Sequence, residues 1–264
     1  MSMQREAHES RSEKFQPIAT IDVIRAMANE GMHPYMVQQA RTRVPGKEDF
    51  TKHLIRFRAE QVVKPQRVGD VTVEAILQNA NDGTSAYKLS SGVFRLVCLN
   101  GCVVGMSYDS VNVRHLGRSV VDDVIEGTYR VLGDAPRIAA QVDQWQGISI
   151  DRDEALRLAE VAHVLRYPEA HLEETDENFR RAPVDAAKLL TARRWGDQER
   201  TNLWTVFNVL QENVIRGGLR GWGERSGRTV RATTRAVTGI DQNTALNKAL
   251  WNLAEGYAAL KTAA

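Results

Sequence analysis

The residues best suited to chemistry are the arginines that follow residue 215. The segment from Arg216 to Arg235 holds six arginines, no lysine, five glycines and one tryptophan, Trp222. Arginine offers a planar fork of N–H donors to phosphate, and an exposed indole stacks on a base. The alternative is a solvated loop between two helices, with Trp222 buried as an anchor. The pattern favours a nucleic-acid contact, in which Trp222 stacks and phosphates are neutralised by Arg216, Arg220, Arg225, Arg228 and Arg231.

A second basic stretch lies near the start of the chain. Between Arg41 and Arg67, eight lysines or arginines stand against three carboxylates, whereas nine carboxylates outnumber four arginines from Asp151 to Arg180. The net charge of +2 is too small to indicate a polyanionic partner, but the segregation of charge along the chain is informative. We expect the two basic segments to share one exposed surface. The early stretch adds two candidate nucleic-acid-binding residues, Arg56 and Arg58.

Arg95 is a further candidate, because it is the only charge in a strand that is predicted to be apolar on both faces. An unpaired guanidinium is costly to bury, so Arg95 needs a partner. It either pairs with a carboxylate or with strand-end carbonyls, or it points into a groove and binds a phosphate.

The sequence offers no organised catalytic, metal or cofactor site. Arg114, His115, His163 and His171 fit no His-x-x-x-His, paired-cysteine, Gly-x-Ser-x-Gly or P-loop pattern. The carboxylates at Asp151, Asp153 and Glu154 could hold a divalent metal, but the spacing of Asp151 and Glu154 is that of a helix capping box. We therefore predict no catalytic residue, no metal ligand and no cofactor, and a metal-dependent nuclease is the least supported class.

Two turn signals, Asp82-Gly83 and Asn100-Gly101, organise the predicted sheet. A two-residue turn at Asn100-Gly101 would pair Leu99 with Cys102 and Cys98 with Val103. Both faces of this central hairpin are then apolar, and the two cysteines point to opposite faces, which disfavours a disulfide or shared metal. The other predicted strands are Leu54–Val63, Val71–Gln78, Ala86–Ser90, ended by a Ser91-Gly92 turn, and Val111–Leu116.

Helical periodicity dominates the chain after residue 117. Helices are predicted near Ile21–Asn29, just after Pro34, at 120–132, 138–145, 151–167 and 197–215, and from Asp241 onward. Asp197 would cap the helix that Gly217-Gly218 ends, and the glycine-rich stretch behind it would be a flexible loop. Within that helix, Glu212 either pairs locally with Arg216 or belongs to a network that holds the Gly-Gly turn.

These elements predict an α+β protein with an antiparallel meander of five or six strands covered by helices and a mainly helical C-terminal half. Residues 1–17 are expected to form a disordered arm, and residues 18–264 a single domain, sheet-rich from 50 to 117 and helical from 118 to 264. No apolar run approaches the roughly 20 residues that span a bilayer, and the polar start does not resemble a secretory signal. We expect a cytoplasmic protein with no membrane partner.

Four segments resemble the phage/plasmid-like protein family, a domain of unknown function found in bacteriophages and plasmids. They are NANDGTSAY, SGVFRLVCLNG, LWTVFNVLQENVIRGGLRG and IDQNTALNKALWNLAE, within a resemblance that covers roughly Asn79 to Ala258. The chain departs from the family pattern at Asn79-Ala80-Asn81, where an Asn-Ser-His or similar run is expected. The resemblance implies a mobile-element context near DNA repair and anti-restriction functions, and it brings no assigned catalytic residues.

Together these observations predict a non-enzymatic protein that binds or anneals single-stranded DNA in recombination or repair. The plan of sheet and helices is similar, in architecture alone, to that of single-strand annealing proteins of the Rad fifty-two type. A homo-oligomer, as a ring or filament, is compatible with this prediction. The alternative is a protein-binding module that uses Asp151 to Asp176 as a polyanion mimic to inhibit a host defence enzyme, with a host or phage protein as its partner.

Overall fold

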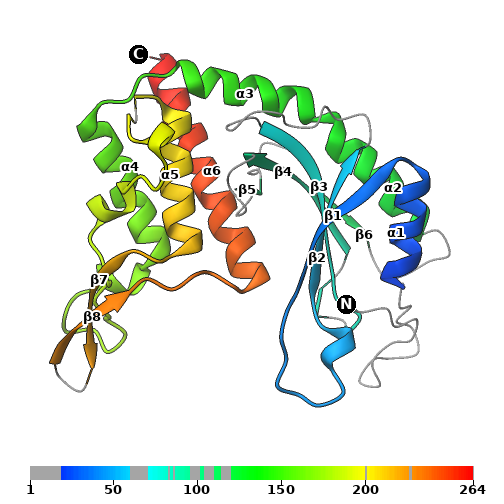
Figure 1. The fold of residues 1–264 in the computed structure, drawn as a ribbon, viewed down its shortest axis with the longest axis horizontal. Helices are drawn as coiled ribbons and strands as arrows, with labels where there is room; N and C mark the ends of the chain where they lie inside the picture. The colour runs from blue at the N-terminus through cyan, green and yellow to red at the C-terminus, as the bar shows by residue number, and fades with distance from the viewer. Residues whose placement is uncertain are drawn as a thin grey trace. The chain divides into compact units, whose positions relative to one another are not determined.

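The computed structural model describes residues 19–59, 71–82, 84–85, 87–95, 102–103, 110–113, 120–199, 201–225 and 228–263. Its internal contacts divide the chain into two compact units, residues 1–139 and 140–264, whose elements are labelled in Figure 1. The predicted arm at residues 1–17 lies outside the described residues, and the single domain from 18 to 264 stays a prediction. None of the helices described here is long and apolar enough to cross a membrane.

The first unit is built on an antiparallel sheet, as the sequence predicts. Its path runs β1-β2-β3-β4, and both β5 and β6 pair with β4. The alternating apolar residues of β2, β3 and β4 place Phe57, Leu77 and Leu89 on one face, where helices α1 and α2 pack. The elements are α1 (Thr20–Asn29), β1 (Met32–Gln39), η1 (Glu48–Phe50), β2 (His53–Ala59), β3 (Val71–Asn79), β4 (Tyr87–Arg95), β5 (Cys102–Val103), β6 (Ser110–Val113) and α2 (Val120–Gly133).

The turn after Asn79 joins β3 to β4, which confirms the first hairpin. Leu77 pairs with Leu89, and the Asp82 carboxylate accepts hydrogen bonds from the backbone N–H and the hydroxyl of Thr84, at 3.0 and 2.6 Å. The predicted turn at Ser91-Gly92 is wrong, because both residues lie inside β4. The Ser91 hydroxyl donates to the carbonyl oxygen of Val131 at 2.8 Å, so its polar group is satisfied within the strand.

The predicted register of the central hairpin is also wrong. Cys102 pairs with Val93, and Val103 pairs with Gly92. Residues 94–101 therefore separate the paired positions Val93 and Cys102, where the predicted turn would leave only Asn100 and Gly101 between Leu99 and Cys102. The predicted partners Cys98 and Leu99, and the Asn100-Gly101 turn itself, lie outside the described residues.

The short helix expected after Pro34 is instead strand β1, which pairs with β2 and shifts register between Pro34 and Met36. β1 is an end strand of the sheet path, where a proline without an N–H is tolerated. Pairing with β2 thus determined that this segment is a strand, although its local sequence indicated a helix.

The second unit is mainly helical, around an aromatic core. The Trp145 ring lies 4.5 Å from Trp251 and 5.5 Å from Phe207, measured between centroids, and Trp204 stacks on Phe207 at 5.6 Å. Its elements are the end of α3 (Ala135–Gly147), α4 (Arg152–Arg166), η2 (Pro168–His171), η3 (Ala186–Leu190), η4 (Trp195–Asp197), α5 (Leu203–Arg216), β7 (Arg220–Arg225), β8 (Arg228–Thr233) and α6 (Ile240–Ala263).

Of the predicted N-terminal caps of α4 and α5, the first is confirmed and the second is wrong. Asp151 and Glu154 form both hydrogen bonds of the predicted capping box at the start of α4. Helix α5 is capped by Asn202, whose side-chain oxygen accepts from the N–H of Thr205 at 2.9 Å, and not by Asp197. Asp197 is buried at the end of η4 and does not cap α5, because α5 begins six residues later at Leu203.

Candidate nucleic-acid interface

The arginine-rich segment after α5 is a β-hairpin and not the flexible loop that its glycines suggested. β7 and β8 pair antiparallel over their whole length, with Trp222 opposite Arg231 and Arg220 opposite Thr233. Directly opposed residues, and residues two apart on one strand, project to the same face of a sheet. Arg220, Trp222, Arg231 and Thr233 therefore share one face, which we call the Arg–Trp face.

Gly221 allows this hairpin to lie against residues 183–184. The N–H of Trp222 donates to the carbonyl oxygen of Pro183 at 2.8 Å, and a β-carbon at Gly221 would lie 1.8 Å from that same oxygen. On the other side, Nε2 of His163 in α4 donates to the carbonyl oxygen of Val184 at 2.8 Å. The residue pair Pro183-Val184 is thus held between a helix and the hairpin.

The base of the hairpin is fixed where α5 ends. Gly217 and Gly218 have φ angles of 65° and 84°, which favour glycine, and they turn the chain into β7. The N–H of Gly218 donates to the carbonyl oxygen of Thr234 at 2.7 Å. The Arg166 guanidinium donates to the carbonyl oxygens of Val214 at 3.2 Å and Arg235 at 3.0 Å.

A charged network reinforces this turn. The carboxylate of Glu212, whose residue is 3% exposed, accepts two hydrogen bonds of 2.9 Å from Arg194 and one of 3.1 Å from Arg216. Arg193 donates to the side chain of Asn213 at 2.8 Å and to the carbonyl oxygen of Gly217. The two alternatives for Glu212 therefore coexist, as a local pair with Arg216 inside a network that holds the Gly-Gly turn.

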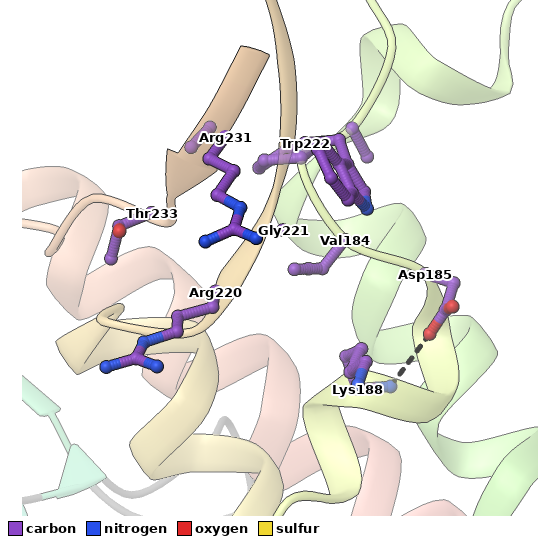
Figure 2. A pocket seen from close by; sticks show the side chains of 11 residues that line it. Val184, Asp185, Lys188, Arg220, Gly221, Trp222, Arg231 and Thr233 are labelled. Carbon is purple, nitrogen blue, oxygen red and sulfur yellow. Dashed lines mark hydrogen bonds between the residues drawn. The ribbon is translucent and has the colours of Figure 1, made fainter. Parts of the chain in front are cut away.

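A groove runs along the Arg–Trp face. It has a volume of about 700 Å³. All four residues of that face line it, together with Gly221 and Ala232 of the hairpin and with Ala182, Pro183, Val184, Asp185 and Lys188. Figure 2 shows the lining side chains, with Arg220, Trp222 and Arg231 carried by the hairpin and Val184, Asp185 and Lys188 by the neighbouring segment. The Asp185 carboxylate is engaged, because it accepts the backbone N–H of Lys188 at 2.9 Å.

The charged side chains of the groove are accessible. Arg220, Arg231 and Lys188 are exposed, and no side chain among those described forms an ion pair with them. Trp222 is 60% exposed, so the alternative in which it is a buried anchor is wrong. A basic groove with an exposed aromatic side chain is the combination by which proteins bind single-stranded nucleic acid.

Arg56 and Arg58 have a different environment, in the first unit. Their Nε atoms lie 2.6 and 2.5 Å from the two oxygens of Glu74, a fully buried carboxylate, and Arg58 stacks on the Tyr35 ring at 3.5 Å. Burial lowers the pKa of Arg56 from its ordinary value, and the Glu74 carboxylate opposes that shift. These two arginines are tied to an acid, so we leave them out of the interface, and the expected shared surface of the two basic segments stays a prediction.

The remaining arginines that were predicted to bind nucleic acid do not lie on the Arg–Trp face, or only their backbone is described. Arg216 is bound to Glu212, with its side chain 57% exposed. Arg228 is exposed but lies opposite Arg225, on the reverse side of the hairpin from Trp222. For Arg225, and for Arg95 in β4 opposite Val71, only the backbone is described. The Arg–Trp face therefore keeps three of the predicted residues, Arg220, Trp222 and Arg231.

Lys188 and the Pro183-Val184 segment were missed in the sequence, since nothing local connects them to β7. The hairpin itself left a signal, because Ser226-Gly227 follows a stretch in which Gly221 and Gly223 alternate with Trp222 and Glu224. Among the residues that the structure describes, no group of three His, Cys, Asp or Glu is placed to hold a metal ion.

Comparison with known proteins places the chain in a family. Residues 7–251 match the family model described as Domain of unknown function (DUF932). Two proteins of Escherichia coli strain K12, UPF0380 protein YafZ and UPF0380 protein YfjQ, are each 40% identical over 248 residues, which cover 94% of this chain and 84% of theirs. No solved structure matches. The chain therefore belongs to the DUF932 family, which confirms the resemblance to a domain of unknown function.

Proposed function

We propose that this protein is a non-enzymatic, cytoplasmic DNA-binding protein of a phage, plasmid or other mobile element, which holds single-stranded DNA on the Arg–Trp face during recombination or repair. The observation that carries the proposal is the pairing of an exposed Trp222 with Arg231 directly across the hairpin. Stacking of a base on an aromatic side chain together with phosphate neutralisation is the usual basis of single-strand binding.

The rigidity of the hairpin supports this function. The backbone of Trp222 is hydrogen-bonded to Pro183, and the turn into β7 is held by Arg193 and Arg166. Side chains carried on a fixed backbone lose less conformational entropy when they bind. The face is therefore arranged for binding before a ligand arrives.

A single strand fits this face better than a duplex. Bases in a duplex are stacked on one another, so an indole reaches a base plane only after that base has left the stack. The phosphate contacts from Arg220 and Arg231 do not discriminate between strand types, because they read charge alone. Preference for a single strand therefore depends on Trp222.

Fluorescence anisotropy with a labelled oligothymidylate at two salt concentrations tests the proposal. Trp222→Ala should weaken binding about tenfold, the effect of losing one stacked base. Trp195→Ala is the matched control, because Trp195 is 86% exposed in the same unit but does not line the groove. Absence of binding at low salt, or equal losses from both substitutions, would overturn the proposal.

The acidic segment supports a second candidate function, a protein-binding module that mimics a polyanion. Exposed carboxylates gather in a short stretch with little regular structure, at Glu169, Glu173, Glu174, Asp176 and Glu177. Asp151 and Glu154 are engaged in capping α4 and do not belong to this set. A protein that ignores DNA in the anisotropy assay yet binds a purified host nuclease, and loses that binding when Glu173 and Glu174 become glutamine, would favour this candidate.

A further inference from the structure

The groove on the Arg–Trp face has the size and composition of a small-ligand site. Its volume of about 700 Å³ falls within the roughly 300–1,000 Å³ of typical ligand pockets. The lining combines apolar groups, from Ala182, Pro183 and Val184, with three cations from two separate segments of the chain and one carboxylate, Asp185, one oxygen of which accepts the backbone N–H of Lys188. A surface that only attracts a polyanion needs charge but no concave, partly apolar lining.

The cations of the groove have fixed backbones on both sides. Lys188 is in η3, where Asp185 caps its N–H, and the Asn213 side chain donates to the carbonyl oxygens of Leu189 at 2.7 Å and Thr191 at 2.9 Å just beyond it. Arg220 and Arg231 are on the two paired strands of the hairpin. Cationic donors from η3, β7 and β8 thus line the groove, and an anion that binds there does not first have to order the main chain.

The indole of Trp222 favours an anion that also carries a flat ring. Inorganic phosphate or sulfate would use the cations only and gain nothing from Trp222 or from the apolar lining. A nucleotide carries a phosphate and a flat base, and Trp222 lies two residues from Arg220 and directly across from Arg231. We infer that the groove binds one whole nucleotide unit, so that a free nucleoside monophosphate occupies it, with phosphate at Lys188, Arg220 and Arg231 and base against Trp222. This inference rests on the proposed function and defines the part of the strand that the site recognises.

Competition with an unlabelled mononucleotide tests this inference on the full-length protein. Thymidine monophosphate should displace a bound labelled oligothymidylate at concentrations where inorganic phosphate of equal ionic strength does not. Lys188→Gln and Arg231→Gln should each weaken mononucleotide binding about tenfold, as expected for loss of a charge-assisted contact. Arg228→Gln, which removes the same charge from the reverse side of the hairpin, should leave it unchanged.

The outcomes separate the two proposals. If the oligonucleotide binds but thymidine monophosphate does not displace it, or displaces it no better than phosphate, the nucleotide site is overturned and DNA binding stands. If thymidine monophosphate quenches the fluorescence of Trp222, by comparison with Trp222→Phe, while no oligonucleotide binds, the DNA-binding function is overturned and a nucleotide site is supported. Failure of both ligands overturns both, provided that circular dichroism shows each variant folded like the parent.

Discussion

The backbone N–H of Trp222 donates a hydrogen bond of 2.8 Å to the carbonyl oxygen of Pro183. This bond fixes the main chain of Trp222, although its indole is exposed to solvent. The carbonyl oxygen of the next residue, Val184, is bound by His163 of α4. The hairpin is thereby connected to the helical core through two consecutive carbonyl groups. The position of the Arg–Trp face depends on this connection, so its loss should affect binding as well as stability.

Replacing Gly221 should break that connection. The β-carbon of alanine would lie 1.8 Å from the Pro183 oxygen, so the hairpin and residues 183–184 must separate. We expect Gly221→Ala to lower the free energy of unfolding by about 1–3 kcal/mol, as overpacking does, and to weaken oligonucleotide binding. Urea denaturation and anisotropy measure the two effects.

Gly223→Ala, on the same strand, is the control for this change. Its β-carbon would meet the Ala232 side chain at 3.2 Å, a contact that a small shift relieves. Its effect on both measurements should be smaller. Equal effects at Gly221 and Gly223 would show that the Pro183 contact is not what holds the hairpin.

The two faces of the hairpin should differ in the salt dependence of binding. Each phosphate contact on a single strand contributes about 0.7 to the slope of log K against log salt concentration, so Arg231→Gln should reduce that slope by about 0.7. Arg228→Gln removes the same charge from the opposite face and should change the slope less. Anisotropy titrations at four or more salt concentrations give the slopes, and equal reductions would contradict a one-sided interface.

Glu212 makes the two arginines bound to it unequal in their importance for stability. Arg194→Met removes two of the three hydrogen bonds to a buried carboxylate, and breaking a buried ion pair costs about 3 kcal/mol. Arg216 is more than half exposed, so Arg216→Met should cost about 1 kcal/mol or less. Chemical denaturation distinguishes these values, and a larger loss from Arg216→Met would refute this ranking.

His53 should make stability depend on pH. Its side chain is fully buried, Nδ1 donates to the carbonyl oxygen of Thr51 at 3.3 Å, and Nε2 lies 2.9 Å from the Thr20 hydroxyl. Burial lowers the pKa of His53 from its ordinary value of 6.5. The native state therefore favours neutral imidazole, and stability is fully present above about pH 6.5 and is lost as the pH falls through the lower native pKa.

The measurement for His53 is the free energy of unfolding between pH 7.5 and 5. The parent protein should lose stability over this range, whereas His53→Gln should be less stable at pH 7.5 but should lose less as the pH falls. An identical pH dependence in the two proteins would assign the effect to other groups.

The sequence by itself determined the features that depend on neighbouring residues. Alternation in β3, the turn at Asn81-Asp82, the Asp151-Glu154 capping box and the glycines that end α5 all follow from interactions within a few residues. These were sufficient to predict an α+β fold with an antiparallel sheet followed by helices. The family was evident from longer motifs for the same reason, since a motif is local.

Three features were decided only by the tertiary structure. They are the register of β5, the formation of strand β1 at Met32–Gln39, and the partner of each arginine. Arg58 and Arg231 are the same residue type in similarly basic segments, yet one is bound to Glu74 on a neighbouring strand and the other lines an open groove beside Trp222. No local pattern separates them, because the acid that neutralises one and the Pro183 contact that positions the other come from distant parts of the chain. The physical reason is that charge compensation and backbone approach depend on distance in space, which chain folding sets and sequence spacing does not.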